Sequence, residues 1–172
     1  MALPPIASGC AVTYSRFRAT PGEDWSYVVA STAIERPSSM RITASAYGGT
    51  MVGTKDNFML TTDIAMVSRQ SLDINSPELA AVVGIQPLPP GRYALNHIGF
   101  YANAWQSWSI SRSVAPSYLE VPAKSVLYVG SYIATRSGSM RVANEEERDL
   151  RIALLKNQKL STLPLIRRVP CQ

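Results

Sequence analysis

The sequence predicts an all-β protein, an antiparallel β-sandwich that carries one short C-terminal α-helix. Short runs of alternating apolar and polar residues recur along the chain, separated by turn residues, as is typical of strands in a sandwich. A single segment, from Asn144 to about Asn157, has the capping residues and the apolar spacing of a helix. With 172 residues, of which 46% are hydrophobic and 17% charged, the chain suits one domain with a substantial core.

The first half of the chain contains four expected strands. Each is a run of alternating, β-branched or aromatic residues, with turn or polar residues on either side. They are Val12–Arg18, Trp25–Ile34, Met40–Tyr47 and Phe58–Val67. After the third of them, Gly48 and Gly49 predict a flexible joint, and residues 68–78 predict a polar loop.

Residues 88–132 carry the strongest strand signals. The sequence Pro-Pro-Gly at 89–91 predicts a turn, because proline presets φ and glycine accepts a positive φ. Residues 92–101 then alternate without a wholly polar face, which favours a strand inside a sheet. We expect residues 80–85 to be its hairpin partner across the turn. Residues 125–130 are apolar on both faces and predict a central strand.

The C-terminal segment predicts the helix and one last strand. Asn144 suits the N-cap, and Glu147 stands where it would complete a capping box. Leu150, Ala153 and Leu154 form an apolar stripe that we expect to pack on a sheet. Residues 163–169 could return as an edge strand, since prolines lie at 164 and 170.

Two segments of this chain together resemble a known group of proteins. The first is L-P-P-G-R-Y-A-L at 88–95, and the second is L-E-V-P-A-K-S-V-L-Y-V-G at 119–130. They resemble a group of small bacterial envelope lipoproteins of unknown function, which have a prealbumin-like or carboxypeptidase-regulatory-like β-sandwich. Ala123 and Lys124 replace the proline-glycine turn that this group has before the tyrosine strand. The resemblance covers about residues 80–160, implies an envelope protein, and brings no catalytic residues.

The two cysteines lie near opposite ends of the chain. The small residues Ala-Ser-Gly directly before Cys10 resemble the end of a lipoprotein signal, although the charged start and most of the apolar run are absent. We therefore expect residues 1–10 to be either a signal-peptide remnant with Cys10 as the lipid attachment site, or an extended N-terminus. In the second case Cys10 could form a disulfide with Cys171 in an oxidising compartment. Residues 11–172 are expected to form the single domain.

A candidate ligand or partner surface lies on two expected strands. Trp105 stands beside a row of serines that includes Ser107 and Ser109, and a ring beside hydroxyls could bind sugar or peptide. Arg16 and Arg18 alternate with aromatic residues, a pattern also found in single-stranded nucleic-acid binding. Arginine that keeps an edge strand soluble is far commoner, so we do not expect nucleic acid. The net charge of +5 and pI of about 9.4 favour acidic partners in general, such as anionic lipid, polysaccharide or nucleic acid.

The sequence predicts no enzyme activity, no cofactor and no metal site. His97 is the single histidine, and its neighbours on the expected strand face are apolar, so we predict a structural role for it. Metal-site spacings and hydrolase signatures are absent. The leading hypothesis is a non-catalytic lipoprotein on the periplasmic side of the bacterial envelope, a structural or interaction module with other envelope proteins as partners. The alternative is a soluble periplasmic binding module for an acidic or glycan ligand. Both leave the oligomeric state open.

Overall fold

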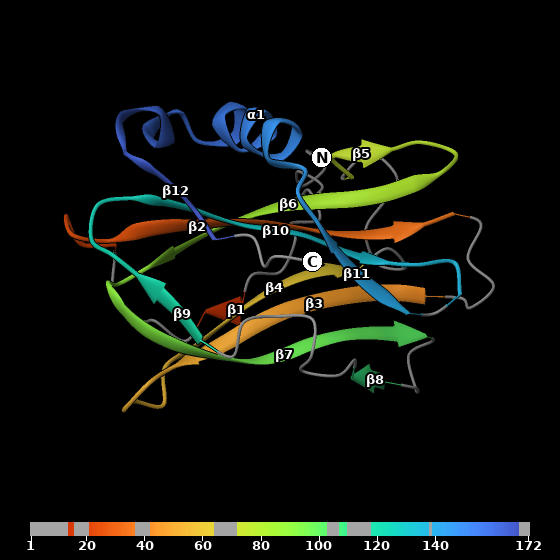
Figure 1. Ribbon diagram of the computed structural model, residues 1–172, viewed down its shortest axis with the longest axis horizontal. Coiled ribbons are helices and arrows are strands. Elements are labelled where there is room, and N and C mark those ends of the chain that lie inside the picture. Colours follow the sequence, from red (N-terminus) through yellow and green to blue (C-terminus); the bar gives the residue numbers. More distant parts are fainter. Residues whose placement is uncertain are drawn as a thin grey trace, which may run out of the picture.

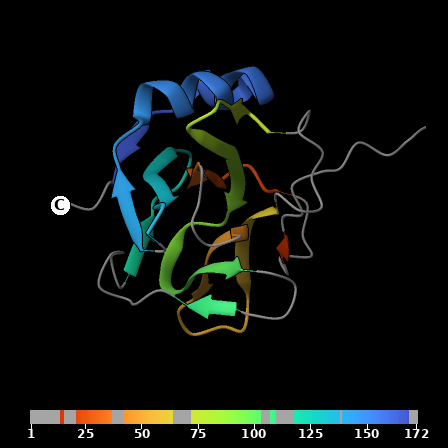
Figure 2. The same ribbon diagram turned by 90° about the vertical axis from the view of Figure 1, so that its right-hand side faces the viewer.

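The strands form two sheets, and one α-helix lies over the outer face of one of them (Figure 1). The computed structural model describes residues 14–15, 21–36, 42–63, 72–102, 107–109, 118–137 and 139–168. Viewed from the side, this part of the chain has three layers (Figure 2). The helix is at the top, one sheet, called sheet B below, lies directly under it, and the other, called sheet A, is at the bottom. The predicted all-β class with one short C-terminal helix is confirmed.

Sheet A is antiparallel throughout its described strands. Its path is β1 (Tyr14–Ser15), β4 (Asn57–Asp63), β3 (Ile42–Met51), β7 (Gly91–Ala102) and β8 (Ser107–Ser109), with β9 (Tyr118–Val121) also paired to β7. Because β8 pairs with residues 99–101 and β9 with residues 91–94, the two short strands share one edge of β7. Of the expected first strand, residues 12–13 and 16–18 lie outside the described residues.

Sheet B is mixed, which departs from the expected antiparallel arrangement. Its path is β11 (Met140–Ala143), β10 (Val126–Ala134), β2 (Ser26–Glu35), β6 (Leu79–Leu88) and β5 (Ile74–Asn75), with β12 (Leu165–Arg167) also paired to β10. β10 runs parallel to both β2 and β12. Parallel neighbours need a long crossover rather than a hairpin, and between β2 and β10 the chain builds most of sheet A. Every residue of β10 is buried, so the predicted central strand is confirmed.

Aromatic side chains fill the space between the two sheets. Tyr47 of sheet A stacks on Tyr132 of sheet B with ring centroids 4.4 Å apart. Phe58 meets Tyr47 edge to face at 5.9 Å and Tyr93 at 5.8 Å. All four side chains are buried, and aliphatic residues from β2, β6, β9 and β10 belong to the same cluster. The two sheets therefore share one core in a sandwich-like arrangement.

The expected hairpin between residues 80–85 and 92–101 is wrong. β6 belongs to sheet B and β7 to sheet A, so the prolines carry the chain from one sheet to the other. Leu88 is buried between the sheets, and the Tyr93 hydroxyl donates a hydrogen bond to the carbonyl of Pro89 at 2.8 Å. The turn residues predict the change of direction, but they do not determine which sheet receives the next strand.

The predicted flexible joint at Gly48 and Gly49 is also wrong, because both residues lie inside β3. The register with β7 shifts between them. A Cβ on Gly49 would lie 2.8 Å from the carbonyl oxygen of Ala94 and 3.1 Å from the ring of Phe58. Glycine therefore allows a close approach of backbone and ring here, rather than a hinge.

The predicted helix is confirmed as α1 (Glu146–Lys156), followed by a 3-10 turn, η3 (Gln158–Thr162). Its cap differs from the expected one: Glu145 occupies the N-cap, and the side chain of Asn144 accepts a hydrogen bond from the N–H of Glu146 at 3.3 Å. Leu150 and Ala153 pack on sheet B as predicted, but Leu154 is 38% exposed and does not belong to the buried stripe. The expected last strand is present as the shorter β12, while the expected loop at residues 68–78 contains β5.

Candidate functional site

A β-bulge in β10 prepares the surface on which the helix begins. The parallel register with β2 shifts between Tyr128 and Ser131. Gly130 lies in this interval with a φ of 107°, in the region that favours glycine. The extra residue lets Tyr128 and Ser131 both face the helix, while Val129 packs between the sheets. The bulge thus adds polar groups to the helix-facing side of an otherwise largely apolar strand.

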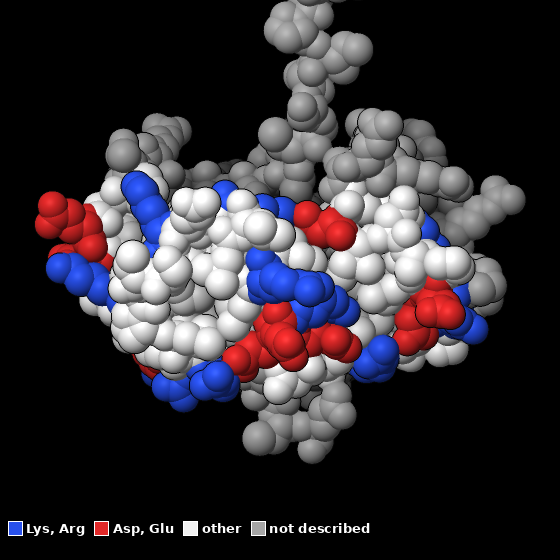
Figure 3. Space-filling model, turned by 90° about the horizontal axis from the view of Figure 1, so that it is seen from above, with Lys and Arg blue, Asp and Glu red and all other residues white. Residues whose placement is uncertain are grey.

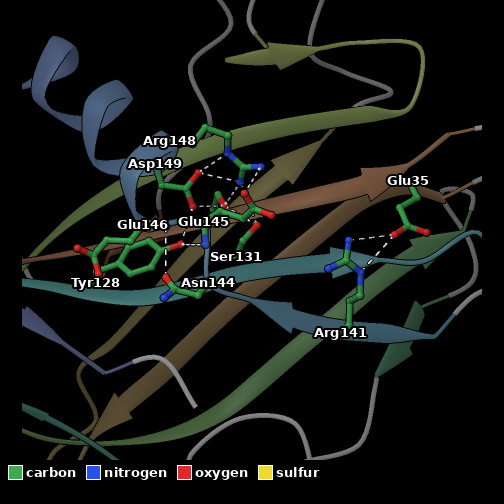
Figure 4. A network of polar contacts seen from close by, with 10 residues as sticks. Glu35, Tyr128, Ser131, Arg141, Asn144, Glu145, Glu146, Arg148 and Asp149 are labelled. Carbon is green, nitrogen blue, oxygen red and sulfur yellow. Dashed lines mark hydrogen bonds and ion pairs between the residues drawn. The ribbon is translucent and has the colours of Figure 1, made fainter. Parts of the chain in front are cut away.

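Asp149 is the centre of a polar cluster between α1, β2 and β10 (Figure 4). In the part of the chain that the structure describes, it is the one charged residue that is buried. Ser31 and Tyr128 donate hydrogen bonds to Oδ2 at 2.6 and 3.0 Å. Two guanidinium nitrogens of Arg148 donate to Oδ1 at 2.9 and 2.8 Å. Both carboxylate oxygens are therefore satisfied within the protein.

Arg148 joins the charged and the hydroxyl parts of this cluster. Ser31 and Ser131 are hydrogen-bonded to each other at 2.7 Å, and a terminal nitrogen of Arg148 donates to each hydroxyl at 3.3 Å. Another terminal nitrogen lies 3.5 Å from the carboxylate of Glu145. The guanidinium remains partly exposed while it pairs with the buried Asp149. This pairing offsets the cost of removing the carboxylate from water.

Tyr128 connects the cluster to the helix start. Its hydroxyl accepts a hydrogen bond from the N–H of Glu145 at 3.0 Å and donates one to Asp149. Burial raises the pKa of Tyr128 well above its ordinary value, and the charge of Asp149 raises it further. The phenol therefore stays protonated and keeps its role as a donor.

The cluster places a hydroxyl beside a carboxylate, as nucleophile–base pairs do. However, Ser31, Ser131 and Asp149 have no exposed surface, so no substrate atom can reach them in this conformation. Their hydrogen bonds all run between the helix and the two strands. The arrangement fastens α1 to sheet B, and it does not have the access that a reaction centre needs.

An open hollow of about 310 Å³ adjoins this helix start. It is lined by Asn144, Glu145, Glu146, Glu147, Arg148 and Arg151. A helix N-terminus usually attracts anions, but three glutamates oppose that here. Seen from above, acidic and basic side chains lie next to each other over the helix, so the described residues of this face form no patch of one sign (Figure 3).

The other end of α1 closes an open edge of sheet B. β5 pairs with β6 only at Ala80 and Ala81. At Val83, the next position on that edge, the N–H donates to the carboxylate of Asp73 at 2.7 Å, and the carbonyl accepts from Lys156 at 2.7 Å. Lys156 and Asp73 also form an ion pair at 2.5 Å. These two side chains take the place of a neighbouring strand and protect the edge from pairing with another chain.

The serines of the candidate surface lie in an edge strand. Ser107 and Ser109 belong to β8, which pairs with residues 99–101 of β7. β1, which ends one residue before Arg16, lies at the opposite edge of sheet A. The two strands β1 and β8 are therefore not neighbours in the sheet. Trp105, Arg16, Arg18, Cys10 and Cys171 lie outside the described residues, and only the backbone of His97, in β7, is described.

Sheet A carries an exposed group at the corner where β7 and β9 pair. Tyr118 is 49% exposed, and the guanidinium of Arg92 lies over its ring at 4.0 Å from the centroid. Arg92 also pairs with Glu120 at 3.1 Å. Val52, whose N–H donates to the carbonyl of Arg92, is likewise 49% exposed. Tyrosine and arginine are the residue types that most often anchor protein interfaces.

Sequence reasoning did not find the Asp149 cluster. Its one local signal is that Asp149 lies four residues before Ala153, on the helix face that packs on the sheet. A carboxylate on that face must find buried donors. The donors Ser31 and Tyr128 come from separate strands, so the residue pattern of the helix could not identify them.

Comparisons with known proteins found no matching family model, no matching curated protein and no matching solved structure. Among the residues that the structure describes, no three histidine, cysteine or acidic side chains form a group able to hold a metal ion. No helix within the described ranges is long and apolar enough to cross a membrane.

Proposed function

We propose that this protein is a non-catalytic lipoprotein of the bacterial cell envelope, anchored on the periplasmic side through a lipid on Cys10. It serves as a structural or interaction module, with other envelope proteins as partners. The observation that carries the proposal is the arrangement of the two segments that resemble small envelope lipoproteins. Residues 91–94 of the first segment pair directly with residues 118–121. Residue 118 precedes the second segment, and residues 119–121 are its first three residues. Two stretches about thirty residues apart in sequence thus belong to one local unit.

The turn inside the second segment also supports the resemblance. Lys124 has a φ of 52°, a left-handed conformation that favours glycine. The group that these segments resemble has a proline-glycine turn at this point. This chain therefore differs from the group in residue type while keeping a backbone that glycine would suit.

The cluster around Asp149 supports a role without catalysis. Its hydroxyl, carboxylate and guanidinium groups hydrogen-bond to one another and hold α1 on sheet B. The exposed corner of Tyr118, Arg92 and Val52 is instead available for contact with a partner.

The alternative proposal is a soluble periplasmic module that binds an acidic or glycan ligand. It is favoured by the position of Ser107 and Ser109 in β8, an edge strand of sheet A. In this alternative, Trp105 would join these serines in the binding surface.

The mass of the protein extracted from bacterial membranes decides between these proposals. We expect a mature chain that begins at Cys10 and carries added acyl mass. Cys10→Ser should move the protein to the soluble fraction, while the matched control Cys171→Ser should leave it on the membrane. An unmodified chain in the soluble fraction would overturn the lipoprotein proposal and favour the soluble module. A mass two hydrogens short would show a disulfide between the two cysteines.

A further inference from the structure

The proposed anchor lies very close to the folded domain along the chain. Four residue steps separate Cys10 from Tyr14, the first residue of β1. An extended chain covers at most about 3.6 Å per residue, so Cys10 lies within about 14 Å of Tyr14 whatever its conformation. A lipid on Cys10 would therefore hold β1 close to the membrane surface.

β1 identifies which side of the molecule this is. It is an edge strand of sheet A, paired with β4 at Tyr14↔Met59 and Ser15↔Phe58. β4 contacts β6 and β3 contacts β2 across the core, so β5, the neighbour of β6, lies on the same side as β1. Both strands lie toward the right-hand side of Figure 2, away from β12.

We propose that the side of the protein formed by β1, β4 and β5 faces the membrane, and that the β9 edge faces away from it. This orientation rests on the proposed lipid at Cys10. Four strand spacings separate β1 from β9 through β4, β3 and β7. At about 4.8 Å per spacing, β9 lies about 19 Å farther from the anchored edge. The exposed Tyr118 and Arg92 are then directed toward the aqueous side, where envelope components can reach them.

Two exposed glutamates offer a matched pair of probe positions. Glu78 lies in the turn between β5 and β6, on the anchored side, and Glu120 lies on β9, on the far side. In a Cys171→Ser background, Glu78→Cys or Glu120→Cys gives one free thiol, because lipid occupies Cys10. Each substitution removes one surface carboxylate, so the two variants are comparable in charge.

The experiment measures the proximity of each position to the bilayer. The lipidated variants are labelled with a small fluorophore and placed in vesicles of phosphatidylethanolamine and phosphatidylglycerol that carry a nitroxide on a fraction of the headgroups. We expect several-fold stronger quenching at position 78 than at position 120, and equal quenching of the two labels when the nitroxide is free in solution.

The outcomes separate this inference from the proposed function. A lipidated protein whose label at 120 is quenched as strongly as the label at 78, or more strongly, overturns the orientation and leaves the lipoprotein proposal intact. A protein whose mass shows no lipid on Cys10 overturns the lipoprotein proposal and removes the anchor on which the orientation depends. Selective quenching at 78 in the lipidated protein supports both.

Discussion

The outer faces of the two sheets differ in whether their ion pairs are buried or exposed. On sheet B, α1 covers the face and encloses a carboxylate with four donors. On sheet A, the described ion pair between Arg92 and Glu120 has both side chains more than half exposed. Buried pairs are costly to break, whereas exposed pairs contribute about 0–1 kcal/mol. The difference indicates that the ion pair under the helix contributes more to the stability of the fold than the exposed pair at the corner of sheet A does.

Alkaline pH should have the largest effect, because it acts on Tyr128 beneath the helix and also on three tyrosines in the core between the sheets. Burial, as the main cause, raises the pKa of Tyr47, Tyr93, Tyr128 and Tyr132 above the ordinary value of 10. The folded state therefore holds these protons more tightly than the unfolded chain, so stability is unaffected below about pH 9 and falls as the pH rises above 10. Four tyrosines would remove up to about 5.6 kcal/mol per pH unit, at about 1.4 kcal/mol each.

Urea unfolding between pH 8 and pH 11.5 measures this loss. Tyr128→Phe should lower the slope by about one tyrosine's share, about 1.4 kcal/mol per pH unit. An unchanged slope in this variant would show that the Tyr128 phenol does not retain its proton in the folded state.

Removal of the buried carboxylate should be the most damaging single substitution. Asp149→Ala leaves Arg148 without its buried partner and the hydroxyls of Ser31 and Tyr128 without their acceptor. We expect a loss of about 3–5 kcal/mol of unfolding free energy. Glu120→Ala, which breaks the exposed pair on sheet A, should cost no more than about 1 kcal/mol. Chemical denaturation of the two variants tests the comparison directly, and equal losses would refute it.

Gly130→Ala should have an intermediate effect. At a φ of 107°, a side chain strains the backbone, at a cost of about 1–3 kcal/mol. Gly53→Ala is the matched control, since Gly53 also has a positive φ, 83°, but lies in an exposed turn where an added Cβ would have no heavy atom within 4 Å. A larger loss of unfolding free energy at Gly130 would measure what the bulge contributes to the cluster. Equal losses would mean that both substitutions act through backbone strain alone.

Lys124→Gly should have the smallest effect and the opposite sign. Glycine relieves the left-handed backbone at a φ of 52°, but the variant loses an exposed ion pair with Asp24 at 3.4 Å. The gain should be about 0.5–1 kcal/mol in unfolding free energy. Lys124→Ala removes the ion pair without relieving the strain, so it should not stabilise. If both variants have the same thermal stability, relief of the left-handed backbone conformation does not explain the effect of Lys124→Gly.

Local patterns in the sequence predicted the elements better than their partners. The run at 125–130 is apolar on both faces, which suffices to predict a buried strand, and the acidic start and apolar spacing suffice for α1. The role of Gly49 depends on the carbonyl of Ala94, and after Pro89 the chain enters the other sheet, where β7 pairs with β3 and β9. These are contacts between distant parts of the chain, and no local pattern encodes them.

The same limit applies to the candidate site. Asp149 could be noticed as a carboxylate on a packing face, but its partner Ser31 lies 118 positions earlier in the sequence. The bulge at Gly130, which brings Ser131 to the same face, depends on the register of a parallel pair. The predicted surface residues Ser107 and Ser109 could be assigned to a strand from alternation alone, and β8 confirms that assignment.

The parallel pairing of β2 with β10 also sets an order of events during synthesis. Ser31 and Ser131, which meet across these strands, are 100 positions apart. At a translation rate of about 5–20 residues per second, about 5–20 s pass between the synthesis of β2 and the synthesis of β10. During that interval β2 can pair with β6 but lacks a neighbour on its other edge, and α1 is not yet present to cover the face. Contacts of such long range also slow folding in general. A nascent chain is therefore most open to wrong pairing just before β10 emerges, and a holding chaperone would have its largest effect there.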